Sequence, residues 1–289
     1  MDAATLIQTL ANSVVLASIY ALVAVGLALG FGVMKMANFA HGEFFMAGAY
    51  TVYALYALGG WPFWVAVFLA MPIVAVLGVA TERVIFRPTR KNILAGFMAT
   101  AGLAFVLQVL AGRIWGVGIA KTVPTPYMGA ADIADAHIGW QRLIVIPCAF
   151  AMLFALRFFL YRVKLGKALR ACAQDPETAA LMGININRMT ALAMALAGAS
   201  AGLAGALMTP IHAVTPYMGH GIILIAFVVV VVGGMASIEG AILAAVLLGF
   251  IHTFVTTLFD STVATMVGVG FMAITLTLRP QGLLGRERA

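Results

Sequence analysis

The sequence has 289 residues, of which 63% are hydrophobic and only 9% are charged, and its mean hydropathy is +1.06. This composition excludes an ordinary soluble domain and indicates a polytopic membrane protein. The net charge of +7 does not call for a nucleic-acid partner, because basic loops beside an anionic membrane surface give the same balance.

Apolar stretches recur along nearly the whole chain. A helix needs about 20 mostly apolar residues to cross a hydrocarbon core of about 30 Å. The sequence therefore predicts an all-α fold, a polytopic bundle of about eight to ten transmembrane helices in one domain over residues 1–289, with at least one broken or re-entrant segment. We place nine spans at about 6–31, 44–60, 62–82, 93–112, 142–161, 189–209, 220–235, 239–258 and 262–279.

Three polar residues, Asn38, His41 and Glu43, stand in "NFAHGE" between the first two spans. In a structural interpretation, Asn38 and His41 satisfy the backbone of a buried turn, and Glu43 stabilises the positive end of the next helix. In a functional interpretation, these residues are candidates for the solute pathway or its gate, because ionisable groups inside membranes are expensive. A surface loop is the third possibility. The first two are compatible, since broken segments often line pathways.

Basic residues predict the orientation, because Lys and Arg collect in the cytoplasmic loops of bacterial inner-membrane proteins. Threading nine spans through the sequence places fourteen of the seventeen Lys and Arg on one side. The amino terminus then lies outside and the carboxyl terminus in the cytoplasm. The basic side holds Lys35, Arg83, Arg87, Arg90, Lys91, Arg157, Arg162, Lys164, Lys167, Arg170, Arg188, Arg279, Arg286 and Arg288.

The predicted cytoplasmic loop at about 163–188 contains "DPETAALMG". Asp175 followed by Pro176 is typical of a helix N-cap and first position, Glu177 adds a negative charge to the first turn, and Gly183 supplies a stop. The predicted helix has about two turns, is too short to be stable alone, and carries apolar residues such as Ala180. It either folds back on the membrane domain or docks on a soluble partner.

A second acid, Glu239, opens the span predicted at 239–258 in "GGMASIEGAILAA". Small residues follow it, as they follow Glu43. We expect either capping of the helix or a role in gating or coupling.

The chain resembles the permease subunits of ATP-binding-cassette importers of the branched-chain amino acid type, the LivH/LivM-like permeases, and more closely the LivH-like member of that pair. The resemblance rests on four stretches spread over residues 20–285, nearly the whole chain. They are "YALVAVGLALGFGVMKMANFAHGEFFMAGAY", "GKALRACAQDPETAALMGININRMTALAMALAGASAGLAGAL", "VVVVVGGMASIEGAILAAVLLG" and "LRPQGLLG".

The resemblance implies a bacterial inner-membrane permease that pairs with a second related permease, two cytoplasmic ATPases and an extracytoplasmic solute-binding protein. It assigns the short helix to coupling with the ATPase. The chain has no G-x-x-x-x-G-K-[ST] phosphate loop, so we expect no bound cofactor and no ATPase activity here, and ATP and magnesium at the partner subunits. The coupling residues are Asp175, Pro176, Glu177, Ala180 and Gly183.

Three questions stay open at this point. A self-sufficient carrier or channel is the alternative class, although it has no need of the short cytoplasmic helix. Leucine, isoleucine and valine are the solutes that the resemblance favours, but similar permeases serve urea, short amides and other small solutes. The permeases pair as a heterodimer or a homodimer. No metal site is expected, because the histidines have no cluster of acidic or cysteine neighbours.

Overall fold

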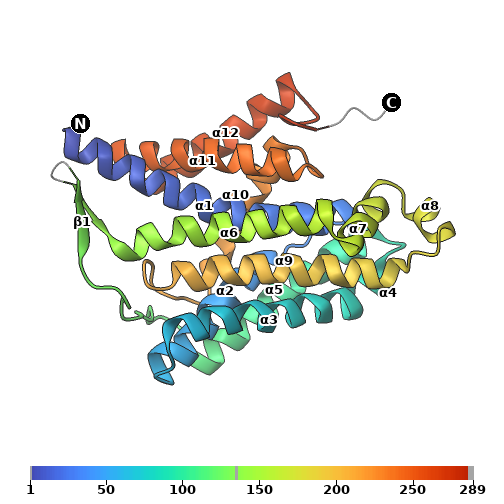
Figure 1. Cartoon of the computed structure of the whole chain (residues 1–289), viewed down its shortest axis with the longest axis horizontal. Helices are drawn as coiled ribbons and strands as arrows, with labels where there is room; N and C mark the ends of the chain where they lie inside the picture. Colours follow the sequence, from blue (N-terminus) through green and yellow to red (C-terminus); the bar gives the residue numbers. More distant parts are fainter. Residues whose placement is uncertain (1, 134–135, 286–289) are drawn as a thin grey trace.

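The computed structural model describes residues 2–133 and 136–285, and most of its helices lie along one axis of the molecule (Figure 1). In this part of the chain, seven helices are long and apolar enough to cross a membrane. They are α1 (Ala3–Met34), α3 (Phe63–Thr81) with its continuation through η2 (Glu82–Phe86) and α4 (Arg87–Thr89), α5 (Ile93–Trp115), α6 (Trp140–Arg162), α9 (Ile186–Met208), α11 (Ile238–Leu258) and α12 (Ser261–Leu278).

Two shorter helical segments account for the other two predicted spans. Helix α2 (His41–Val52) continues into a π-helical segment, η1 (Tyr53–Leu58), and α10 (Met218–Gly233) has only 16 residues. The predicted all-α bundle is confirmed, and each of the nine predicted spans corresponds to helix. Seven of these segments have full spanning length, whereas the short helices α2 and α10 begin inside the bundle and η1 has no buried residue.

The core forms around α1 and α9, which are the most buried of the long helices. Helix α2 packs against α3, α9 and α10, while α11 packs on α1 and α12 covers α10 and α11. Figure 1 shows α11 and α12 on one side of this core and α3 and α5 on the other. Large apolar side chains remain exposed on α3, α5, α6 and α12, as a surface facing lipid or another membrane subunit requires.

The basic residues predicted to share one side gather at one end of the bundle, where η2, α4 and the segments after α6 lie (Figure 1). Hydrogen bonds join these segments: Lys35 Nζ donates to the Ala173 carbonyl, and Arg90 donates to the Asn187 side chain. We call this the basic end. Of the predicted set, Arg286 and Arg288 lie outside the described residues.

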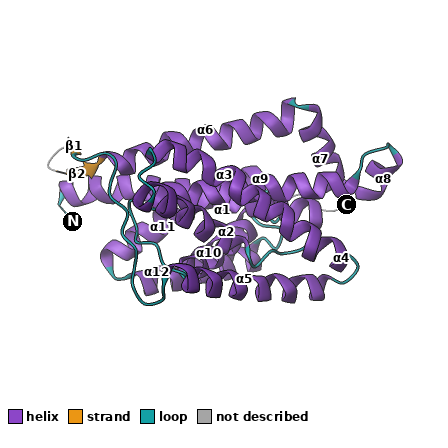
Figure 2. Cartoon of the chain, turned by 90° about the horizontal axis from the view of Figure 1, so that it is seen from below, coloured by secondary structure: helices purple, strands orange, loops and turns teal. Residues whose placement is uncertain are grey.

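Helix α7 and a small β-sheet are present in addition to the elements predicted from the sequence. The loop at 163–188 holds two helices, α7 (Lys164–Gln174) and α8 (Pro176–Leu181), and only the second was predicted. At the other end, a small antiparallel sheet pairs β1 (Ala130–Ile133) with β2 (Ala136–Gly139), with Ala130 opposite Gly139. Seen from below, α7 turns off the end of α6, and α8 lies beyond the neighbouring helix ends (Figure 2).

Glycines allow α9 to touch its neighbours backbone to backbone, as its Gly- and Ala-rich sequence predicts. A Cβ at Gly205 would lie 1.9 Å from the Phe45 carbonyl oxygen, and one at Gly198 would lie 2.5 Å from the Val74 carbonyl oxygen. The first contact holds α2 and the second holds α3. Close packing on α9 therefore fixes the short helix α2 in the interior.

Candidate functional site

The chain doubles back after α1. Helix α1 ends at the basic end with Lys35 in the left-handed region at φ 57°. The chain then returns into the bundle, where the Val23 carbonyl oxygen accepts a hydrogen bond of 3.0 Å from His41 Nε2. Val23 is 11 residues before the end of α1, about 16 Å at 1.5 Å per residue. Helix α2 therefore begins deep inside the protein.

The first turn of α10 meets the first turn of α2 at this depth. A Cβ at Gly42 would lie 2.3 Å from the Gly219 carbonyl oxygen, so the two backbones are in direct contact. From this junction α2 leads away from the basic end, and α10 leads to it, where Gly234 packs against Gly282. The positive ends of two half-helices thus converge in the interior, as in transporters whose binding sites are built from broken helices.

Glu43 lies at this junction and is 1% exposed. Its Oε1 accepts a hydrogen bond of 2.7 Å from the Gln108 side chain of α5. Asn38 is also buried, and its Oδ1 accepts from the Ala40 amide. Glu43 Oε2 and Asn38 Nδ2 have no hydrogen-bond partner among the described residues. The geometry fits the structural interpretation of this turn. It also leaves a buried acceptor on Glu43 and a buried donor on Asn38 unpaired within the described residues.

Aromatic rings close the junction on the side of the basic end. Phe39 packs against Phe97 of α5 at 4.3 Å between ring centroids and against Phe227 of α10 at 4.9 Å. Phe227 also lines an apolar cavity of about 200 Å³ between α1, α10, α11 and α12. Tyr20 and His252 are polar groups on that cavity wall, with ring centroids 6.0 Å apart.

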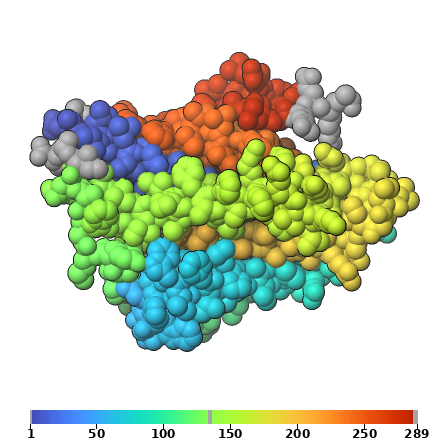
Figure 3. All heavy atoms as spheres, viewed as in Figure 1, coloured from blue at the N-terminus to red at the C-terminus, as the bar shows by residue number. Residues whose placement is uncertain are grey.

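Helix α8 forms as predicted, at the tip of the basic end (Figure 3). The Asp175 carboxylate caps it by accepting from the amides of Glu177 and Thr178, Pro176 takes the first position, and Gly183 ends it at φ +81°. Only Ala179 is buried against the rest of the chain.

The other apolar residues of this segment face outward. Leu181 is 87% exposed and Met182 is 78% exposed, and Ala180 is exposed as well. If this helix only folded back on the membrane domain, that would explain the burial of Ala179 but not the exposure of the other apolar side chains. An ordered helix that presents apolar side chains outside the membrane-spanning helices has the form of a docking element.

Glu239 lies in the first turn of α11 at the basic end, where the side chain of Ser237 supplies the cap. The carboxylate of Glu239 binds the side chains of Arg157 and Tyr161 on α6, each at 2.8 Å. Its side chain is 44% exposed. Glu239 thus connects α11 to α6 and is far less buried than Glu43.

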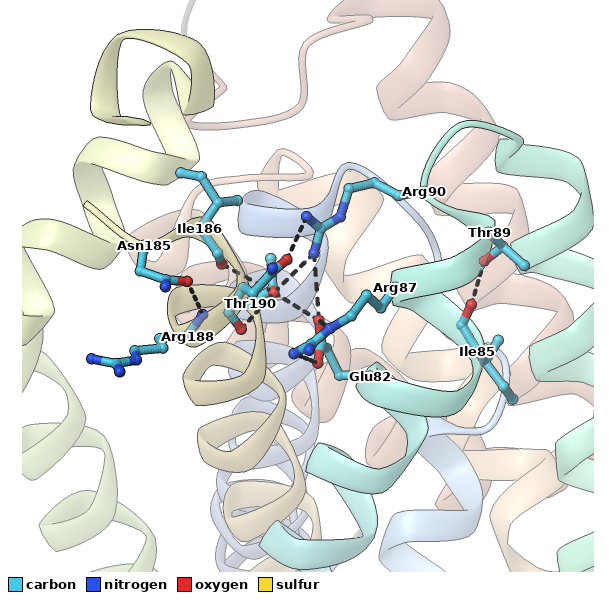
Figure 4. Close-up of polar contacts among 10 residues, drawn as sticks. Glu82, Ile85, Arg87, Thr89, Arg90, Asn185, Ile186, Arg188 and Thr190 are labelled. Carbon is cyan, nitrogen blue, oxygen red and sulfur yellow. Dashed lines mark hydrogen bonds and ion pairs between the residues drawn. The ribbon is translucent and has the colours of Figure 1, made fainter. Parts of the chain in front are cut away.

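A second buried acid, Glu82, was not singled out from the sequence (Figure 4). The Glu82 side chain is fully buried at the end of α3, where it binds Arg87 at 2.9 Å and Arg90 at 3.4 Å and accepts from the Thr190 hydroxyl at 2.8 Å. Arg90 also donates to Asn187 and Thr190 on α9. This cluster fastens the end of α3 to the start of α9, directly after α8.

Neither Glu82 nor Gln108 was singled out from the sequence, although the sequence contains a signal for each. Glu82 precedes two arginines by five and eight residues, a spacing that a helix with an extra residue in its turn brings to one side. Gln108 is the one amide inside the span predicted at 93–112, and polar residues at that depth mark functional or packing sites. Neither signal predicts which residue is the contact partner, because partners can be far apart in the sequence, as Glu43 and Gln108 are at 65 residues.

A bundle of apolar helices with an interior junction of half-helices defines a multi-pass membrane transport protein. Residues 9–278 match the family of branched-chain amino acid transport system permease components, and the chain belongs to this family. It is thus a permease component of a membrane transport system, as the sequence predicted.

Individual relatives are similar over nearly the whole chain. The high-affinity branched-chain amino acid transport system permease protein BraD of Pseudomonas aeruginosa is 33% identical, covering 97% of this chain and 96% of its own length. Permease protein LivH of the same kind of system in Escherichia coli K12 is 31% identical with the same coverage. Permease protein LivM of Escherichia coli K12 is 27% identical over 94% of this chain and 69% of its own length.

The cap of α8 predicts a dependence on pH. The Thr178 hydroxyl, together with the amides of Thr178 and Glu177, holds the pKa of the Asp175 carboxylate below its usual value. The cap therefore contributes stability above the usual Asp pKa and loses it as pH falls through the lowered pKa. We expect protection of the Glu177 and Thr178 amides from hydrogen exchange, corrected for the intrinsic rate, to fall in acid.

Asp175→Asn is the matched control, because an amide keeps the accepting oxygen and does not titrate. Its amide protection should stay constant over the same pH range. Parallel pH profiles for the two proteins would contradict the assignment of Asp175 as the titrating cap.

Proposed function

We propose that this protein is the LivH-like permease subunit of an ATP-driven importer for branched-chain amino acids in a bacterial inner membrane. The exposed, capped helix α8 carries the proposal, because a self-sufficient carrier has no use for an apolar docking helix beyond its membrane-spanning helices. The names of the relatives BraD and LivH support the solute class. Similarity to both LivH and LivM supports a heterodimer with a second, related permease.

In this proposal the basic end faces the cytoplasm and the amino terminus lies outside, since basic residues favour the cytoplasmic side. Helix α8, over Asp175, Pro176, Glu177, Ala180 and Gly183, sits in a groove of one of two ATPase subunits, which bind ATP and magnesium. A solute-binding protein delivers the amino acid to the opposite end. The permease supplies the path and two conformational states, and it need not bind its solute tightly.

The connection from α8 to the solute path runs through packed elements. Helix α9 begins three residues after Gly183, and the Glu82 cluster joins the start of α9 to α3. Further along, α9 holds α2 through Gly205 and Gly48. A displacement of α8 by its partner therefore acts on the junction at Glu43 through α9, a rigid helix. We assign Asn38, His41 and Glu43 to the path or its gate, and Glu239 to the joint between α6 and α11.

Ala180→Arg tests the docking function. Ala180 is exposed, so the longer side chain leaves the fold intact but clashes with a partner's groove. In proteoliposomes that contain the purified complex and binding protein, ATP-dependent uptake of radiolabelled leucine should be lost, and the ATPase should no longer copurify. Ala130→Arg, on an exposed alanine at the opposite end, should leave ATPase copurification unchanged.

Uptake without ATP that is unaffected by Ala180→Arg would instead indicate a carrier. An excess of unlabelled isoleucine or valine should compete with leucine, whereas urea should not. Competition by urea alone would replace the solute and leave the coupling mechanism in place.

Glu43→Gln tests the solute path. Glutamine has the same shape and can still bond Gln108, but it lacks the charge on the unpartnered Oε2. We expect uptake to fall about tenfold with assembly unchanged, because an amide donor replaces the free acceptor that Oε2 offers to a donor group of the solute, a loss of about 1.5 kcal/mol. Asp260→Asn, which neutralises an exposed cap of α12, is the control and should transport normally. Normal uptake by Glu43→Gln would restrict Glu43 to a structural role.

A further inference from the structure

A polar groove opens at the basic end between the end of α3 and the start of α9. It encloses about 280 Å³, and its lining includes three arginines and no acidic residue. The lining residues are Arg83, Arg87, Asn185, Asn187, Arg188 and Ala191. Arg87 and Asn187 also belong to the Glu82 cluster, whereas neither docking through α8 nor the junction at Glu43 uses the side chains of Arg83 and Arg188.

The shape of the groove follows from the packing of its two helices. A Cβ at Gly78 would lie 2.3 Å from the Met194 carbonyl oxygen, so α3 and α9 are in backbone contact at this level. One to two turns closer to the basic end the helices carry long side chains instead, with Arg83 on η2, Arg87 at the start of α4 and Arg188 on α9. The groove is the space that opens where the glycine contact ends.

The charges in the groove are only partly compensated. Arg87 binds the buried Glu82, which is shared with Arg90 (Figure 4). The side chains of Arg83 and Arg188 have no ion-pair or hydrogen-bond partner within the described parts of the chain, and Figure 4 shows Arg188 extended away from Glu82. Arg188 is also in the first turn of α9, whose positive end adds to the potential. The uncompensated positive charge therefore favours the binding of an anion in the groove.

The position of the groove indicates where the anion comes from. Arg83 lies 20 residues after Phe63, the first residue of α3, which is about 30 Å of helix and matches the hydrocarbon thickness of a bilayer. Ile73, Val76 and Ala80 share one face of α3 at spacings of three and four residues and are exposed, Val76 by 68%, and Arg83 follows Ala80 by three residues in η2. An apolar track for an acyl chain thus leads to the arginines at headgroup level.

We propose that this groove binds the phosphate-bearing headgroup of an anionic phospholipid, held by Arg83, Arg87 and Arg188, with an acyl chain along the exposed face of α3. Arginine suits a phosphate because its planar group donates two parallel hydrogen bonds. Basic pockets between transmembrane helices bind such headgroups. The bound lipid would bridge α3 and α9 beside the Glu82 cluster. This proposal needs only that the basic end lies at a membrane surface, and it stands or falls separately from the solute and the ATPase.

The test measures lipid affinity of the full-length chain in detergent, from the shift in its thermal unfolding on titration with phosphatidylglycerol or phosphatidylcholine. The wild-type protein should prefer phosphatidylglycerol. Arg83→Gln with Arg188→Gln should weaken that binding about 30-fold, since each arginine near the surface contributes about fivefold. Arg162→Gln with Arg279→Gln removes equal charge from exposed positions at the same end, and it should keep the preference.

Four results would overturn the proposal. The first is equal binding of both lipids by the wild-type protein, and the second is an equal loss in the two double variants. The third is a shift of the same size with inorganic phosphate in place of the lipid, which would assign the groove to a soluble anion. Loss of ATPase copurification in Arg83→Gln with Arg188→Gln, with lipid preference unchanged, would assign the groove to a protein partner instead. Arg83→Lys with Arg188→Lys keeps the charge and should retain most of the preference.

Discussion

The structure depends on one constraint: backbone N–H and C=O groups inside a membrane must be paired within the protein. A chain that breaks a helix in the interior must supply partners or close packing for the exposed ends. Here Asn38 accepts from a backbone amide at the start of α2, and the ring of His41 bonds a carbonyl of α1. Gly42 and Gly219 then bring two half-helix ends into contact without side chains between them. Asn38 and His41 thus pair with backbone groups at the point where the helix breaks.

In the proposed mechanism, that junction and helix α8 are connected through α9. Helix α9 contacts α2 through glycines in the interior and is joined to α3 at the basic end by Glu82, Arg90 and Thr190. The Glu82 carboxylate is fully buried, and loss of its half-exposed arginine partners would leave its charge uncompensated, so separating these elements is costly. Exposed pairs such as Arg157 with Glu239 are weaker in general. The proposed lipid site lies against the joint at Glu82 and would add to it on the membrane side.

Much of the fold was predictable, because length and apolarity determine which segments span a membrane. All nine predicted segments are helical, and the N-cap, the proline and the terminal glycine of α8 were predicted because these signals are local. Helix α7 was missed because its apolar positions, such as Leu169 and Cys172, repeat within a strongly basic stretch. The pairing of Glu43 with Gln108 and of Glu82 with Thr190 was not predictable. The first two residues are 65 positions apart in the sequence and the second two are 108 apart, so their contacts depend on how the helices are arranged.

The central claim is that the chain re-enters after α1 and that α2 and α10 begin at one interior junction. Cross-linking with a short, membrane-permeant bifunctional maleimide tests it directly, with Phe39→Cys and Phe227→Cys in a chain whose Cys148 and Cys172 are changed to serine. The centroids of the two rings are 4.9 Å apart, so thiols at these positions should lie within reach of the reagent, whereas Phe39→Cys with Phe154→Cys on the outer face of α6 should give no cross-link. No cross-link in the first pair, together with rapid labelling of Phe39→Cys by a membrane-impermeant maleimide, would place residue 39 at the membrane surface and contradict the account.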